Sequence, residues 1–399
     1  MFKPEPFSNR PPHFSSELIA YAVDAELEYA RTDEMSVRFP YGSSLRRSLA
    51  RLEAISTASI AGPTPDVRLM VWLLGQDVVG NRAALDKPAP PFTCSPSLIE
   101  ATRAAFRYGK AIEKISTTPQ GFALSESDFI AVHAYLTSGN APETEAPYRR
   151  TRLLPPKEGA AETRAAYRPP DPEKIPPLMK DLFAYLSVPQ LTPCLQAAVA
   201  HFQLQAICPF QTSMDRIERY LALAILHRRG LSKHLIPTIG FPLASGYDNY
   251  TRLLMPYRHA SATDFELGSA LEMWARCCID DLKQSTQVVR TYMRQLRKVA
   301  ESYQQRIGSY RQGSTVDMLI RELPGLPLLD SSIAMELTGR GFTAVSEALD
   351  KLVECGILKQ VGSTQRNRLF EAPEVVQTEQ NILDTMLPSP ARKHAEPHF

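Results

Sequence analysis

Pro209 divides two apolar stretches of the chain that both have helical character. Before it, Phe202 and Ala206 are four positions apart and share a helical face, and the proline ends a helix of this kind. After it, residues 220–226 read Tyr-Leu-Ala-Leu-Ala-Ile-Leu, which is typical of a buried helix. The sequence therefore predicts a helix, a loop over 208–214 and a second helix.

Charged residues crowd the start of the second helix. Asp215 can cap this helix or enter its first turn, and Arg216 and Arg219 are three apart, so they share a face. The free backbone amides of a helix start and two guanidinium groups both attract anions. We therefore expect an anion site here, although ion pairs with Asp215 or Glu218 would explain the arginines equally well.

Residues 208–219 resemble the signature loop of the Fic family. In words, that loop runs His-Pro-Phe-x-Asp/Glu-Gly-Asn-Gly-Arg-x-x-Arg, and the family transfers a nucleotide, usually AMP from ATP, onto a protein hydroxyl. Four positions match: Pro209, Phe210, Arg216 and Arg219. The resemblance implies a mainly α fold: a Fic-type helical bundle with an N-terminal helical region, a small β-hairpin flap and a C-terminal winged-helix domain.

The loop departs from the family pattern where the chemistry is done. Cys208 replaces the general-base histidine, Thr212 replaces the magnesium-binding acid, and Ser213-Met214-Asp215 replaces Gly-Asn-Gly. A general base needs a pKa near neutral, whereas a cysteine ordinarily titrates near about 8.5. Threonine lacks the anionic oxygen that magnesium prefers, and Met214 hinders the close backbone approach to phosphate that glycine allows. We expect AMP transfer to be close to abolished.

Three functions stay open at this stage. The first is a Fic-like pseudoenzyme that regulates or binds a protein partner, and a homodimer is possible. The second is a transferase of nucleotidyl or phosphate groups with altered chemistry, in which Cys208 is catalytic and ATP and Mg²⁺ are the cofactors. The third is a DNA-binding regulator. No metal site is expected otherwise, and the candidate nucleotide or anion ligands are Thr212, Ser213, Arg216 and Arg219.

Composition divides the chain into four predicted regions. The first, 1–140, is the N-terminal helical region, and 141–310 is the Fic-like core with its loop at 208–219. Residues 314–377 form the winged-helix domain, and 378–399 form a tail that we expect to be disordered.

Prolines dominate residues 148–170, where the resemblance places the flap. In the family this hairpin holds the target backbone by strand addition, so Leu153 and Leu154 are the candidate target contacts. A proline-rich linker between helical units explains the same composition nearly as well.

Two features of the N-terminal region bear on regulation. Arg46, Arg47 and Arg51 lie on one predicted helix, and we interpret them as a solvated basic face. The resemblance also implies an inhibitory Ser/Thr-x-x-x-Glu-Gly/Asn helix whose glutamate reaches an active-site arginine. The best placed stretch, 76–81, has no glutamate at the required point, so we expect this chain to lack the inhibitory glutamate.

The C-terminal region has the predicted order helix, helix, helix, hairpin. Its third helix carries Glu347, Asp350 and Glu354 but only Lys351 as a cation, whereas DNA readers need basic side chains there. We therefore favour protein docking or dimerisation over DNA binding. The weak candidates for nucleic-acid contact are the basic residues of the wing: Lys359, Arg366 and Arg368.

Bulk properties exclude several classes of protein. The 399 residues are 44% hydrophobic with a net charge of +2, which indicates neither a nucleic-acid nor a membrane partner. Six cysteines form no CxxC pair, as in a reduced cytoplasmic protein rather than a disulfide scaffold. No stretch reaches the roughly 18 apolar residues of a membrane span. We expect a soluble cytoplasmic protein.

Overall fold

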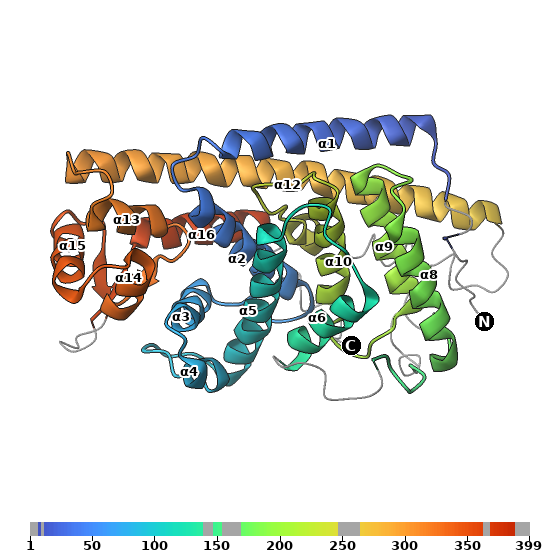
Figure 1. The fold of residues 1–399 in the computed structure, drawn as a ribbon, viewed down its shortest axis with the longest axis horizontal. Helices are drawn as coiled ribbons and strands as arrows, with labels where there is room; N and C mark the ends of the chain where they lie inside the picture. The colour runs from blue at the N-terminus through green and yellow to red at the C-terminus, as the bar shows by residue number, and fades with distance from the viewer. Residues whose placement is uncertain are drawn as a thin grey trace.

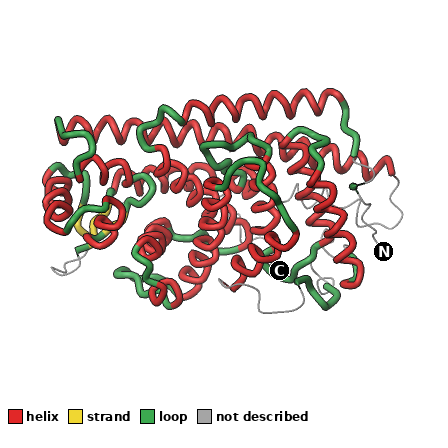
Figure 2. Tube along the Cα trace, viewed as in Figure 1, coloured by secondary structure: helices red, strands yellow, loops and turns green. Residues whose placement is uncertain are grey.

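The structure is a computed structural model that describes residues 7–8, 12–138, 147–153, 169–245, 264–361 and 368–387. It is mainly helical, as predicted (Figures 1 and 2). The described strands form one small antiparallel sheet in the order β1-β3-β2. Within these ranges, none of the helices is both long and apolar enough to cross a membrane.

Two parallel helices run along one side of the molecule (Figure 1). The longer one, α12 (Asp264–Ile307), has 44 residues, so it is about 66 Å long at about 1.5 Å per residue. Beside it lies α1 (Ser16–Ser36), whose N-cap Ser15 accepts a hydrogen bond from the Leu18 amide. Tyr21 of α1 donates to Asp280 of α12, and Glu28 of α1 accepts from Arg290 at 2.6 Å.

The helices that lie between α1 and α12 in the sequence build the core that holds the loop 208–214. In chain order they are α2 (Gly42–Ala61), α3 (Val67–Val78), α4 (Arg82–Asp86), α5 (Pro96–Thr117), α6 (Glu126–Ser138), the short 3-10 helix η1 (Pro172–Lys174), α8 (Ile175–Ser187), α9 (Pro193–Ile207) and α10 (Met214–Arg228). A Cβ at Gly109 of α5 would lie 3.1 Å from the Met70 side chain of α3, so glycine permits this close packing. The buried apolar residues form one continuous cluster from Phe7 to Leu383.

The predicted solvated basic face on α2 is wrong. Arg51 is fully buried: its Nη1 donates to the Gly325 carbonyl at 2.7 Å and its Nε to Glu379 at 2.8 Å. Arg46 donates to the carbonyl of His234, and Arg47 forms ion pairs with Glu113 and Glu322. The reason is that α2 is covered by the C-terminal part of the chain, which local sequence does not reveal.

The C-terminal region follows the predicted order and adds two elements to it. Strand β1 precedes the second helix, and a fourth helix follows the hairpin. The prediction that 378–399 is disordered is wrong for 378–386, which are helical, and Ile382 and Leu383 are buried there. Whether the unit functions as a winged helix stays a prediction. Its elements are α13 (Thr315–Glu322), β1 (Leu328–Leu329), α14 (Ser331–Thr338), α15 (Phe342–Glu354), β2 (Lys359–Val361), β3 (Leu369–Glu371) and α16 (Pro373–Met386).

Candidate functional site

The loop between α9 and α10 contains two residues with left-handed backbone conformations. Cys208 has φ 46°, and Ser213 has φ 60°. Residues with a side chain rarely adopt this region, at a cost of about 1 kcal/mol or more each. Ser213 stands where the Fic pattern has its first glycine. The loop therefore keeps a backbone shape suited to glycine although the glycine itself is gone.

Helix α6 fixes the middle of the loop through an aromatic stack. The buried Phe210 ring lies face to face with His133, with ring centroids 3.6 Å apart and planes at 7°. The Nε2 of His133 donates to the Thr212 carbonyl at 3.0 Å. Burial lowers the pKa of His133, and the charge of Arg216 lowers it further, so the ring is neutral at pH 7. His133 thus supports the loop from outside the signature.

Arg149 holds the start of the loop from the other side. Its backbone N–H donates to the Pro209 carbonyl at 2.9 Å, and its Nε donates to the Cys208 carbonyl at 2.8 Å. The same buried side chain donates to the carbonyls of Thr151 and Pro170. One guanidinium group therefore joins the loop to both ends of the predicted flap.

Little of the flap itself can be compared with its prediction. Its described parts, 148–153 and 169–170, contain no strand. Leu153 is half-buried there, whereas Leu154 and the rest of the predicted hairpin lie outside the described residues. The tyrosine-rich stretch 247–254, where the resemblance places part of the nucleotide pocket, also lies outside them.

Cys208 does not have the properties of a general base. Part of its surface reaches solvent, but burial raises the pKa of its thiol to about 11, with a smaller opposing effect from the Arg149 charge. Its Sγ lies 3.9 Å from the Phe210 carbonyl oxygen. At neutral pH the sulfur is a protonated thiol that cannot accept a proton from a target hydroxyl.

The two arginines of the signature diverge instead of forming one anion site. Arg216 has 18% of its side chain exposed, and its Nη2 donates to the Ser213 hydroxyl at 3.1 Å. Arg219 has 1% exposed, and its Nη1 donates to the Asp215 carbonyl at 2.6 Å. Its Nη2 is 3.9 Å from Glu218 Oε1. Arg219 thus belongs to the core, and of the two only Arg216 reaches solvent.

Sequence reasoning missed a buried carboxyl group on α2, Glu53, whose charge acts on Arg219. Glu53 is fully buried and accepts from the Gly240 amide at 2.8 Å and the Tyr108 hydroxyl at 3.2 Å. Burial raises the pKa of Glu53 to about 7, and these hydrogen bonds and the charge of Arg219 oppose the rise. The signal in the sequence was a lone glutamate on an apolar helix face. The predicted stretch 76–81 lies elsewhere, at the end of α3, where Asn81 donates to Gln76.

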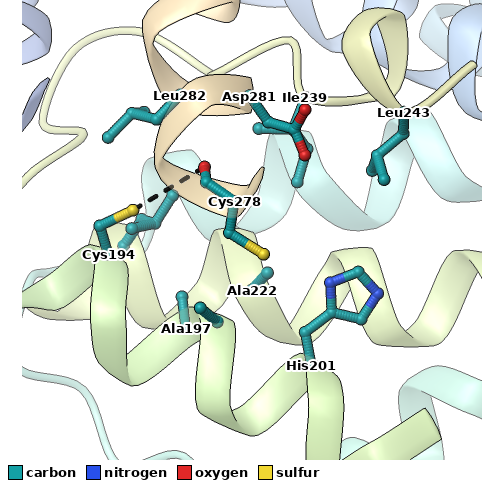
Figure 3. A pocket seen from close by; sticks show the side chains of 11 residues that line it. Cys194, Ala197, His201, Ala222, Ile239, Leu243, Cys278, Asp281 and Leu282 are labelled. Carbon is teal, nitrogen blue, oxygen red and sulfur yellow. Dashed lines mark hydrogen bonds between the residues drawn. The ribbon is translucent and has the colours of Figure 1, made fainter. Parts of the chain in front are cut away.

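A small cavity lies behind the loop, between α9, α10 and α12. Figure 3 shows the His201 ring and the Cys278 thiol projecting into it, with the Asp281 carboxyl on its far side. Burial raises the pKa of Asp281 well above its ordinary value, and the Arg219 charge opposes this rise. The volume is about 30 Å³, which is room for a water molecule and far too little for a nucleotide.

The structure describes two of the three basic residues predicted for the wing, Lys359 and Arg368. Lys359 is exposed on β2, whereas Arg368 donates to Asp350 at 2.9 Å and lies over the Phe370 ring. Arg366 lies outside the described residues.

Comparison with known families agrees with this helix-loop-helix. Residues 123–226, from the segment before α6 to the last turn of α10, match the model of the Fic/DOC family. Residues 123–226 form a Fic/DOC domain. A search of curated proteins finds no match to the chain.

A search of solved structures finds two Fic proteins of low identity. A Fic family protein from Desulfovibrio desulfuricans G20 is 16% identical, with a TM-score of 0.47, over 91% of this chain and 98% of that one. A Fic domain containing signaling protein from Bacteroides thetaiotaomicron VPI-5482 is also 16% identical, with a TM-score of 0.42, over 67% of this chain and 98% of that one. The family assignment rests on the match of residues 123–226 alone.

The residues of this Fic domain do not fit the ATP and Mg²⁺ that the resemblance implies. Thr212 offers no carboxylate, and its carbonyl is already engaged by His133. Arg219 is enclosed by acidic side chains instead of facing a phosphate. Among the described residues, no group of three or more His, Cys, Asp and Glu side chains is placed to hold a metal ion.

Proposed function

We propose that this Fic-like protein is a pseudoenzyme that does not transfer AMP and acts by binding a protein partner. The observation that carries the proposal is Cys208. It stands where the family has its general base, and burial raises the pKa of its thiol to about 11. A group with that pKa is protonated at neutral pH and cannot activate a target hydroxyl.

The surroundings of Arg219 support the same conclusion. The family uses the arginines of this loop on the nucleotide, yet Arg219 is buried beside Glu218 and within reach of the Glu53 charge. Releasing it would leave buried carboxylates without their cation, which is costly.

The altered transferase with Cys208 as its catalytic residue finds no support in these properties, because it needs a thiolate near pH 7. We therefore assign no cofactor. The six cysteines are all free thiols, which is consistent with the cytoplasmic location that we propose.

A thermal shift experiment tests the proposal. The full chain is melted with and without ATP and Mg²⁺, beside an Arg216→Ala variant and a Fic protein with an intact loop as a positive control. We expect the melting temperature of the wild type to be unchanged by nucleotide. A clear rise that disappears in Arg216→Ala would show that the loop still binds nucleotide and would contradict the proposal.

A further inference from the structure

Helices α1 and α12 are paired through a regular row of cations on α12. Arg276, Lys283 and Arg290 are spaced seven residues apart, so they lie in one row along the helix. Arg276 pairs with Glu17 at 3.0 Å, and Arg290 pairs with Glu28 at 2.6 Å. Lys283 lies over the ring of a third α1 residue, Tyr21. Each cation of the row thus contacts a residue of α1.

The row continues beyond the end of α1. The next position is Arg297, whereas α1 ends at Ser36. Hydrogen-bonded partners on the two helices are 257 to 262 positions apart, for example Ser15 with Glu272 and Arg290 with Glu28. This separation places Arg297 next to Arg38, just past the end of α1. Figure 1 shows that α12 extends well past α1 toward the C-terminal helices.

This uncovered part of α12 has an excess of free positive charge. Arg38, Arg294, Arg297 and Lys298 are all exposed, and none forms an ion pair or side-chain hydrogen bond with the residues that the structure describes. We call these four residues the open stripe. The exposed acid on this face of α12 between 294 and 305 is Glu301. The open stripe therefore keeps most of its positive charge.

Two exposed apolar side chains border the open stripe. Met35 is 64% exposed and Val37 is 59% exposed at the end of α1. By the same separation Met35 lies beside Arg294. Exposed apolar groups next to unpaired cations fit a partner that is both apolar and acidic.

We propose that the open stripe binds an acidic amphipathic helix of a partner protein, which continues the pairing that α1 begins. The proposal names the partner chemistry of the proposed pseudoenzyme function and rests on it. An acidic helix would place a carboxylate on Arg297 as Glu17 and Glu28 do on the earlier cations, and it would cover Met35. Phosphates of a nucleic acid would leave Met35 and Val37 uncovered and would meet Glu301.

The test uses fluorescence anisotropy with the full chain and a labelled synthetic helical peptide that carries glutamates at heptad spacing beside leucines. A peptide with glutamine in place of glutamate is the matched control. We expect the glutamate peptide to bind at least tenfold more tightly than the glutamine peptide. Charge reversal by Arg297→Glu with Lys298→Glu should weaken its binding at least tenfold, and a lysine peptide should restore binding to that variant.

Control variants separate this effect from net charge and from folding. Lys114→Glu with Lys180→Glu makes the same charge change at exposed positions on α5 and α8 and should leave binding unchanged. All variants should melt at the wild-type temperature. Equal binding of both peptides, or unchanged binding by the reversed variant, would overturn the proposal.

A 20-base-pair DNA duplex and vesicles containing phosphatidylserine are measured in parallel. The proposal is wrong if the DNA or the vesicles bind more tightly than the glutamate peptide and this binding is lost in the variant Arg297→Glu with Lys298→Glu. The open stripe would then be a binding site for nucleic acid or lipid. The thermal shift with nucleotide on the same samples reports separately on the pseudoenzyme function. A failure of the peptide-binding proposal can therefore be distinguished from a failure of the pseudoenzyme proposal.

Discussion

Arg51 on α2 and Glu379 on α16 form a fully buried ion pair, with 2.8 Å between Nε and Oε2. The Tyr292 hydroxyl of α12 donates to the same carboxylate at 2.9 Å. Two positions further along α2, Glu53 carries the charge that acts on Arg219. Helix α2 therefore contacts the C-terminal region through Arg51, and the charge of Glu53 on the same helix acts on Arg219 of α10.

Removing one partner of this ion pair should destabilise the fold strongly. Glu379→Ala leaves the Arg51 guanidinium buried without its anion, so we expect a loss of about 3–5 kcal/mol in the free energy of unfolding. Urea denaturation measures it. The double variant Arg51→Met with Glu379→Leu should lose less, because no charge stays buried. A loss below about 1 kcal/mol in Glu379→Ala would disagree with a buried pair.

The Arg149 side chain should matter far more than that of its neighbour. Arg149→Ala removes the side-chain donors to three carbonyls, those of Cys208, Thr151 and Pro170, so we expect a loss of about 2 kcal/mol and faster amide hydrogen exchange around the loop. Arg150→Ala is the matched control, because that side chain is exposed. Equal effects of the two substitutions would mean that Arg149 does not hold the loop.

Cys208 should react slowly with alkylating reagents. Because burial raises the pKa of its thiol to about 11, little thiolate is present at pH 8. We expect carbamidomethylation by iodoacetamide to be at least about a hundredfold slower than for glutathione, whose thiol is near the ordinary value. Peptide mass spectrometry over time measures the rate at this position. Modification at the glutathione rate would indicate an activated cysteine.

Much of this local structure could be predicted from the sequence. The position of Pro209 and the apolar residues on either side of it predicted the two helices that the structure has, α9 and α10. What could not be predicted were the partners of Arg51, Glu53 and Arg149. Arg51 meets a residue 328 positions away, and Arg149 meets one 59 positions away. Local pattern gives the face of a helix, but the element that packs on that face depends on the whole fold.

The same limit explains the errors. Three arginines on α2 looked like a solvated face because nothing nearby in sequence covers them. The stretch 76–81 was chosen for the inhibitory helix by its order in the chain, whereas the glutamate whose charge acts on Arg219 is Glu53, which lies on α2. Helix α16 was missed because its buried residues, such as Ile382, have their contacts in α12 and α2.

Glu53 should make stability depend on pH. Its pKa is about 7 in the folded protein against 4.5 as the ordinary value, so the folded state binds the proton more tightly. This contribution to stability is complete below pH 4.5 and is lost as the pH rises through 7. Replacement by Gln removes that dependence.

The measurement compares the free energies of unfolding of wild type and Glu53→Gln at pH 5 and pH 8. From pH 5 to pH 8, the free energy of unfolding of Glu53→Gln should rise relative to that of wild type by on the order of 3 kcal/mol. Glu100→Gln, which changes an exposed carboxylate on α5, is the control and should show no such gain. A constant difference between wild type and Glu53→Gln would mean that this carboxyl is not held in its protonated form.

Transfer of labelled AMP tests the central claim most directly. The wild-type chain, a Cys208→Ala variant and a Fic protein with an intact signature loop are incubated with α-labelled ATP, Mg²⁺ and a cell lysate at pH 7.5. The account predicts that wild type and Cys208→Ala give the same background, while the intact Fic protein labels its targets. Labelling of proteins by the wild type that is absent with Cys208→Ala would contradict the account.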